Sequence, residues 1–469
     1  MAGDFETALQ AVMARAVPGF LALTHCEQLT SGASQETWRI TCDCSSGERR
    51  FALRRAQPTA SPGNGLGSLP LAVEARLLQL VRESDVPGPV VRYVLQATDG
   101  LGEGFLMDWL DGETLGMKIV HGDEFTAVRP GLARRCGEIL ARIHALDWQA
   151  AGLAQALPVM TPASLIDETW NHYRTLDVPV PMIDYSWRWL RENLPADSRM
   201  TLVHGDFRNG NLMLSTRGIN AVLDWELAHV GDPLRDLGWL CVNSWRFGNS
   251  ELPVGGFGTI EDLLAGYNAA SGLAVTPQEL RYWQVFGSFW WAVATLQMAA
   301  AWRSGETPSL ERPVIGRRSS EAQMDCVNLL LPGEFELPDT QASIGAGTQL
   351  PMPAELLEGV ASFLKTRVAA ELDAHGGFLA KVAANSLRIA QRELQYGDAL
   401  RCAELSRLQD LLGESEKDLD TLRRQLVMRL RDDLPLTTPG LGEHLRQTVA
   451  TQCFIDQPRY SALHGKTSS

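Results

Sequence analysis

One segment constrains the fold of this chain more than any other, because it sets polar residues at fixed steps beside two short apolar strands. It reads Leu202-Val203-His204-Gly205-Asp206-Phe207-Arg208-Asn209-Gly210-Asn211-Leu212-Met213-Leu214, and Ala221-Val222-Leu223-Asp224 follows a turn. If residues 212–214 pair symmetrically with 221–223 in an antiparallel hairpin, Asn211 faces Asp224, with Cβ atoms roughly 4.5–5.5 Å apart. An amide oxygen and a carboxylate at that separation can share a hard cation such as Mg²⁺, which prefers oxygen ligands.

Asp206 precedes Asn211 on the loop that enters this hairpin. From there its carboxylate can accept a proton from a hydroxyl nucleophile or orient that hydroxyl. Taken singly, a His, Asp or Asn in a loop is usually a turn or capping residue. The prediction of a metal-assisted site therefore depends on the combined spacing.

This arrangement resembles the catalytic loop and metal-binding Asp of kinases, in the His-Gly-Asp-x-x-x-x-Asn version of the aminoglycoside phosphotransferase (APH) family. The resemblance covers roughly residues 20–330. It implies that Asp206 is the catalytic residue, that Asn211 and Asp224 bind Mg²⁺, and that ATP is the phosphoryl donor. The run Gly231-Asp232-Pro233-Leu234-Arg235-Asp236-Leu237 is also similar. There Asp236 matches a buried carboxylate that accepts hydrogen bonds from the catalytic-loop backbone, so His204 and Asp236 are expected to support the loop.

The resemblance implies an α+β, bilobal protein-kinase-like fold, with a small β-rich N-lobe at residues 1–105 and a mainly helical C-lobe at residues 106–336. The residue pattern agrees with this fold. Residues 25–56 alternate like a β-meander, and a helix is predicted from about Leu71 to Ser84. Short strands are predicted near residues 201–203, 212–214 and 221–223.

A second region follows the two lobes. Residues 337–353 have the Pro- and Gly-rich composition of a linker. Residues 354–431 have helical periodicity almost throughout. Through the stretch at residues 381–394, residues 354–469 resemble a helical domain of unknown function that follows such phosphotransferase domains in some bacterial proteins. We expect a separate all-α domain that offers a surface for a homo-oligomer or a protein partner, and we assign it no chemistry.

The N-lobe provides an independent test of the resemblance. Kinase-like folds place a Lys on the third strand, paired with a Glu on the next helix and near the nucleotide phosphates. Lys118 is the only lysine before residue 365, and it lies outside any such strand. The matching strand contains Ala52 and Arg54 on one face, so Ala52 would leave room for the base and Arg54 would reach the phosphates.

The helix that follows carries Glu74 on the same face as Leu77 and Val81, the side expected to be buried. A buried, unpaired carboxylate costs several kcal/mol or changes its pKa, so Glu74 needs a cation, and Arg54 is the candidate. Arg at this position is similar to the branch related to the kinase-like region of certain acyl-CoA dehydrogenase fusion proteins. The alternative is that Arg54 and Arg55 solvate an edge strand while Glu74 caps its helix or faces water.

The turn at residues 30–37 is a weak phosphate-loop signal, because Gly32 is its only glycine. The side chains of Ser31 and Ser34 and nearby backbone N–H groups can hydrogen-bond phosphate oxygens. An ordinary hairpin turn explains the same residues almost equally well.

The hinge between the lobes is expected near residues 105–112. There the backbone from Asp108 to Leu110 would read the edge of the adenine, as in a kinase-like cleft. The neighbouring Met107 and Trp109 can equally be plain core residues. Two alternatives remain for Glu226, which follows shortly after Asp224. Its carboxylate either contacts a second Mg²⁺ or faces outward from the end of a strand.

Charge and composition argue against a nucleic-acid-binding protein and against a membrane-spanning one. The chain has 42 Lys+Arg against 56 Asp+Glu, a net charge of −14, which argues against a surface built for nucleic acid or anionic lipid. Residues 283–302 carry no charge over a length that could span a bilayer. Gln284, Ser288 and Thr295 fall on one stripe of that helix, however, which favours a buried helix. The N-terminus lacks a basic segment followed by an apolar core, from which we expect a cytoplasmic protein.

Two functions remain open. The first is ATP- and Mg²⁺-dependent transfer of the γ-phosphate to a hydroxyl of a small molecule, because no activation loop or Ala-Pro-Glu segment for a protein substrate follows Asp224. The related branch suggests a hydroxyacyl thioester or another metabolic alcohol as acceptor. The second is a catalytically weak or inactive nucleotide-binding regulatory module that serves the C-terminal helices, favoured by the absent lysine and the single-glycine turn.

Overall fold

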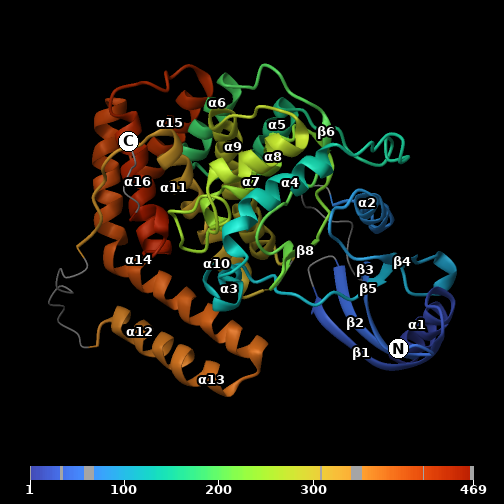
Figure 1. The fold of residues 1–469 in the computed structure, drawn as a ribbon. Helices are drawn as coiled ribbons and strands as arrows, with labels where there is room; N and C mark the ends of the chain where they lie inside the picture. The colour runs from blue at the N-terminus through green and yellow to red at the C-terminus, as the bar shows by residue number, and fades with distance from the viewer. Residues whose placement is uncertain are drawn as a thin grey trace.

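A computed structural model describes residues 2–31, 35–56, 68–306, 309–339, 351–415 and 417–464. Its small lobe is built on a sheet and its larger part is helical (Figure 1), so the α+β, two-lobe arrangement expected from the sequence is present. All eight cysteines are free thiols, and most of them are buried.

The N-lobe is a five-stranded antiparallel sheet in the order β1-β2-β3-β5-β4. Its strands are β1 (Phe20–Ser31), β2 (Gln35–Cys44), β3 (Gly47–Ala56), β4 (Val91–Val94) and β5 (Gly104–Asp108), and its helices are α1 (Ala2–Ala16) and α2 (Leu71–Glu83). Helix α1, which the sequence patterns did not predict, covers the face of the sheet that includes Phe51 and Leu53. Ala52 and Arg54 alternate with them and therefore point to the opposite face.

The C-lobe contains most of the helices. These are α3 (Gly116–His121), α4 (Leu132–His144), α5 (Pro162–Thr175), α6 (Pro181–Glu192), α7 (Leu234–Leu240), α8 (Ile260–Ser271), α9 (Pro277–Arg303), α10 (Glu311–Arg317) and α11 (Ser319–Leu330), with strands β6 (Thr201–Val203), β7 (Leu212–Ser215), β8 (Gly218–Val222) and β9 (His229–Gly231). Gln284, Ser288 and Thr295 of α9 are buried, as expected for a core helix. No helix among the described residues has the length and apolar character needed to cross a bilayer.

The hairpin of β7 and β8 forms, but its predicted register is wrong by one residue. The prediction left residues 215–220 as a turn, whereas Ser215 pairs directly with Gly218 and a bulge follows at Asn220. The bulge adds one residue to β8, so Asn211 lies opposite Leu223, whose N–H donates to the Asn211 carbonyl at 2.8 Å. Asp224 is one step further along than expected.

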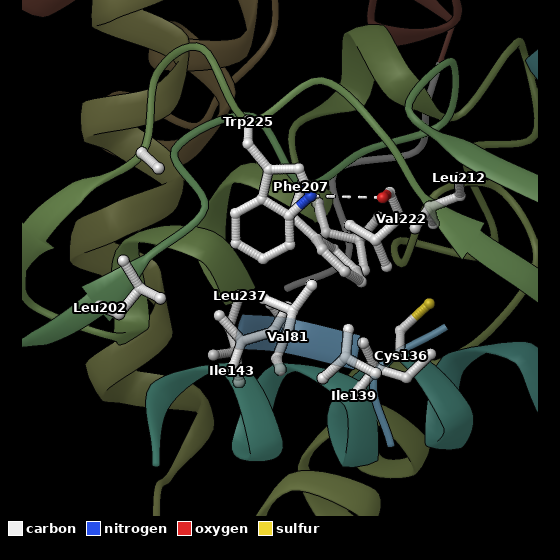
Figure 2. Packing of buried hydrophobic residues seen from close by; sticks show 14 of the residues in the cluster. Val81, Cys136, Ile139, Ile143, Leu202, Phe207, Leu212, Val222, Trp225 and Leu237 are labelled. Atoms are coloured by element: carbon white, nitrogen blue, oxygen red, sulfur yellow. Dashed lines mark hydrogen bonds between the residues drawn. The ribbon is translucent and has the colours of Figure 1, made fainter. Parts of the chain in front are cut away.

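A single apolar cluster links both lobes beneath this hairpin. Figure 2 shows the rings of Phe207 and Trp225 packed over Ile139 and Ile143 of α4, with Val81 of the N-lobe helix α2 beside them. Trp225 is fully buried, and its Nε1 donates to a backbone carbonyl of β8 at 3.3 Å. The loop that contains Phe207 and the β7–β8 hairpin therefore pack against one apolar core, to which α2 of the N-lobe also contributes.

The C-terminal region is entirely helical, as expected. It comprises α12 (Pro353–Phe363), a π-helical turn (Leu364–Val368), α13 (Ala369–Glu371), α14 (Ala374–Leu412), α15 (Leu419–Asp432) and α16 (Leu441–Asp456). Helices α15 and α16 lie on the side of the C-lobe away from the N-lobe (Figure 1), and together with α14 they share one apolar cluster with α6, α9 and α11. Much of the expected linker, residues 340–350, lies outside the described residues, so the proposed domain limits stay predictions.

Candidate active site

The loop at residues 204–211 is held at its start by one buried carboxylate. Asp236 of α7 accepts hydrogen bonds from the backbone N–H of His204 at 2.8 Å and of Gly205 at 2.9 Å. His144 Nε2 lies 3.2 Å from the same carboxylate. Burial by itself would raise the pKa of Asp236, but the hydrogen bond with His144 and the nearby positive charges hold it at about 2. The carboxylate thus stays ionised and fixes the loop entry.

The imidazole of His204 connects the loop to the hairpin. Its Nδ1 accepts from the N–H of Asp206 at 3.1 Å, and its Nε2 lies 3.0 Å from the carbonyl of Leu223. These partners require a neutral ring protonated on Nε2, in keeping with burial, which lowers the pKa of His204. Gly205 between them has φ 85°, and a Cβ there would lie 2.3 Å from the carbonyl of Leu227. Only glycine fits at that position.

The carboxylate of Asp206 is buried and has three side-chain donors. Its Oδ1 accepts from Trp239 Nε1 at 2.7 Å and from Arg208 Nε at 2.9 Å. Its Oδ2 accepts from Asn211 Nδ2 at 2.6 Å, and the same amide nitrogen donates to the Asp206 carbonyl at 2.9 Å. Trp239 and Arg208 were not among the residues predicted from the sequence. Trp239 was detectable, because it follows Asp236 by three residues on one helix and so shares the face that meets the loop.

Asp224 ends the hairpin in a left-handed conformation, with φ 64°. Such a φ is uncommon outside glycine, is tolerated best by Asn and Asp, and tends to occur at functional sites. From this position the carboxylate meets the N-lobe: Oδ1 lies 2.7 Å from Arg54 Nη2.

Arg54 is the centre of an ionic cluster that joins the lobes. Besides Asp224, its guanidinium contacts Glu74, with Nη1 to Oε1 at 3.2 Å, and lies 3.9 Å from Glu226 Oε2. Its Nε donates to Gln35 Oε1 at 2.5 Å, a contact that no sequence signal indicated. The ion pair expected between Arg54 and Glu74 is present, and Glu226 faces this cluster.

Glu74 is the most buried acid of the cluster, with 1% of its surface exposed. Burial raises its pKa to about 7, because Arg54 lowers the value less than burial and the charges of Asp224 and Glu226 raise it. The pKa of Glu226 is also raised, by burial and by Asp224. The guanidinium of Arg54 therefore faces the carboxylates of Glu74, Asp224 and Glu226.

Residues 25–281, more than half of the chain, match the profile of the phosphotransferase enzyme family, APH. The chain belongs to the APH phosphotransferase family. Residues 370–460 match a domain of unknown function, DUF6285.

Several known proteins are similar to this APH-family chain. Mouse acyl-CoA dehydrogenase family member 10 is 29% identical over 222 residues, 46% of this chain and 20% of that protein. Mouse family member 11 is 28% identical over 247 residues, 50% of this chain and 30% of that protein. The chain thus spans less than a third of the length of these relatives. A crystal structure assigned as an aminoglycoside phosphotransferase from Ralstonia eutropha has a TM-score of 0.56 at 21% identity, covering 68% of this chain and 96% of that one, and shows the shared fold.

The oxygen donors near Asp224 suit a hard cation. Asn211 binds Asp206 through Nδ2, so its Oδ1 is turned away and accepts no hydrogen bond from the residues that the structure describes. Within the same described ranges, no three His, Cys, Asp or Glu side chains gather closely enough to hold a metal by themselves. An ion here would need the Asn211 amide and the Asp224 carboxylate together with water and phosphate oxygens, which is the usual environment of protein-bound Mg²⁺.

The remaining predicted site residues of this APH-family chain lie on strand β3 and in the hinge between the lobes. Ala52 is buried on β3 beside Arg54. The side chain of Asp108 is engaged by Arg92 through two bonds, at 2.7 and 2.6 Å, and its N–H donates to a neighbouring carbonyl. The N–H of Trp109 bonds the carbonyl of Arg50, and the N–H of Leu110 makes no hydrogen bond within the described chain, so among residues 108–110 it is the one amide without a partner.

The phosphate-loop prediction is mostly outside the described structure. Gly32 and Ser34 lie outside the described residues, and Ser31 is described only by its backbone, which pairs with Glu36 at the end of β1. Their contact with phosphate stays a prediction.

Proposed function

We propose that this protein transfers the γ-phosphoryl group of ATP, with Mg²⁺, to a hydroxyl group of a small molecule. The observation that supports this most directly is the 2.7 Å contact between Arg54 of the N-lobe and Asp224 of the C-lobe. It brings a cation suited to phosphate to the hairpin end where the two oxygen ligands lie, and the imidazole of His204 ties that hairpin to Asp206.

Each residue then has a definite task. Asp206 takes the proton of the acceptor hydroxyl as the hydroxyl oxygen attacks the γ-phosphorus, and the bond to the bridging β,γ-oxygen breaks to release ADP. Mg²⁺ held by Asn211 and Asp224 would neutralise charge on the phosphates. His204 and Asp236 keep the loop in place for this transfer.

The N-lobe holds the nucleotide in this proposal. Arg54 contacts the phosphates, and Glu74 orients the guanidinium from the buried side. Ala52 leaves space above the base, and the backbone at Leu110 reads its edge. Asp108 contributes only its backbone there, because Arg92 occupies its carboxylate.

The surroundings of Asp206 indicate the class of acceptor. Trp239, Trp245, Trp290 and Trp291 form an aromatic cluster with ring centroids 5.0 to 6.4 Å apart, and Trp239 is the one bonded to Asp206. Arg208 already covers the Trp245 ring at 4.3 Å. A neutral or anionic alcohol with an apolar body therefore fits better than a polycationic aminoglycoside, which agrees with a hydroxyacyl thioester or another metabolic alcohol.

The test is ATP consumption by the full chain with Mg²⁺ across a library of hydroxylated metabolites, with nucleotide binding measured separately. We expect turnover with at least one apolar alcohol, and its loss in Asp206→Ala with ATP binding retained. Asp197→Ala, an exposed aspartate, is the matched control and should behave as wild type. A wild type that binds ATP but consumes none with any acceptor would refute the proposal and support a regulatory module.

A further inference from the structure

A cavity lies at the junction between the phosphotransferase lobe and the C-terminal helices. Its volume is about 230 Å³, and it is lined by the end of α5, the connection to α6, and one face of α15. Those two walls come from the segments that match the APH family and DUF6285, respectively. It shares no lining residue with the candidate active site.

Three arginines line this cavity, and they are not neutralised equally. Arg431 donates through Nε to the buried Asp184 at 2.7 Å, while its Nη groups make no bond within the described residues. Arg424 bonds the exposed Asp177 at 3.0 Å. Arg174 is exposed, and its guanidinium has no hydrogen bond or ion pair in the part of the chain that the structure describes. The wall therefore carries an excess of guanidinium donors.

Asp177, the partner of Arg424, is the one carboxylate among the lining residues, and most of the remaining lining is apolar. Val178 and Pro179 close one side, and Val427 and Met428 of α15 close the other. Tyr173 offers only its ring, because its hydroxyl already bonds the Val178 carbonyl at 2.8 Å and the Val180 N–H at 2.9 Å. Guanidinium groups beside an apolar surface suit a ligand that has one charged end and an apolar body.

We propose that this cavity binds a small organic oxyanion, a carboxylate or phosphate monoester on an apolar body. The planar fork of Arg pairs bidentately with either group. A cation would meet like charge from the arginines, and a neutral ligand would lack the negative charge that pairs with the guanidinium groups of Arg174 and Arg431. The volume lies below the range of drug-sized sites, which indicates a ligand of about the size of benzoate. Since both walls contribute, the bound anion also holds α15 against the α5–α6 connection.

The experiment is calorimetric titration of the full chain with benzoate, phenyl phosphate and benzyl alcohol, the neutral counterpart of the two anions. We expect saturable binding of at least one anion and binding of benzyl alcohol about tenfold weaker or more. The preferred anion distinguishes a carboxylate from a phosphate ligand.

Two variants locate the binding. Arg174→Ala removes an exposed side chain and should weaken anion binding about tenfold without unfolding. Met428→Trp places a large ring at the exposed mouth and should block binding. Arg134→Ala, an exposed arginine on α4, is the matched control. The proposal is overturned if neither anion binds saturably up to about 10 mM, if benzyl alcohol binds as tightly, or if both cavity variants bind as wild type does. Phenyl phosphate bound in the active-site cleft would persist in Arg174→Ala, and only the component lost there counts.

Discussion

The two sides of the active-site cleft are stabilised in opposite ways. On the C-lobe side, hydrogen-bond donors are abundant: Asp236 fixes two backbone amides, and Asp206 has three side-chain donors. Where the N-lobe meets the hairpin, Arg54 is the only cation among the described residues that pairs with Glu74, Asp224 and Glu226. The loop around Asp206 is thus held in place by hydrogen bonds, whereas the ionic cluster around Arg54 carries more negative than positive charge. Binding of a cation with nucleotide should rearrange only the latter.

The largest effect is expected at Asp206, on the C-lobe side. Asp206→Asn keeps the size of the side chain but cannot accept the hydroxyl proton, so kcat should fall about a thousandfold. Nucleotide affinity should change little, because Arg54 and Asp224 are untouched. Steady-state turnover and equilibrium nucleotide titration test this pair of outcomes.

Asp236 tests whether the loop depends on that carboxylate for stability. Asp236→Ala leaves two loop amides and the buried Arg235 without their counter-charge, and should lower the free energy of unfolding by about 3–5 kcal/mol. Denaturant unfolding measures this loss. Asp197→Ala should cost under about 0.5 kcal/mol, and an equally small cost at Asp236 would mean that the loop is held by its apolar core instead.

Glu74 tests the charge excess on the N-lobe side through pH. Its pKa is raised from 4.5 to about 7 in the folded state, so the folded state binds this proton more tightly than the unfolded chain. Its stabilising contribution is complete below pH 4.5 and is lost as the pH rises to 7, a difference of about 3 kcal/mol. Glu74→Gln cannot ionise, so it should gain stability relative to wild type by that amount across this interval.

Unfolding free energies of wild type and variant at matched pH values measure the gain. Glu83→Gln, exposed at the end of the same helix, is the control and should run parallel to wild type. If the unfolding free energy of Glu74→Gln also runs parallel to that of wild type as the pH changes, the ionic cluster does not carry an excess of negative charge.

How far the sequence predicted this cleft depended on the range of the contacts. The strand period that paired Ala52 with Arg54, and the helical face that turned Glu74 inward, are local patterns, so both residues could be placed from the sequence alone. The register of the hairpin could not, because it depends on a turn tighter than predicted, with Ser215 paired to Gly218, and on a bulge at Asn220 that then shifts every later pair by one residue. No residue type marks either feature unambiguously.

Other partners were missed because no periodic pattern in the sequence determines them. Gln35 reaches Arg54 only because β2 and β3 are adjacent, and Arg208 reaches Asp206 through a loop conformation set by glycines. The packing of α14 to α16 against the C-lobe could not be predicted either, because the sequence pattern of an apolar helix face does not identify the element that the face contacts.

The smallest expected effect, at Arg54, sharpens the contrast between the two sides. A lysine keeps the charge but presents a point charge in place of the planar fork, so it cannot contact Glu74 and Asp224 together as Arg54 does. Arg54→Lys should therefore weaken Mg-nucleotide binding about tenfold, near 1.4 kcal/mol, with a much smaller change in kcat once the enzyme is saturated. Arg55→Lys is the matched control on the same strand: Arg55 bonds Glu36 on the other face of the sheet and should leave nucleotide affinity unchanged. Equal losses in both variants would mean that general N-lobe charge, and not the position of one guanidinium, attracts the nucleotide.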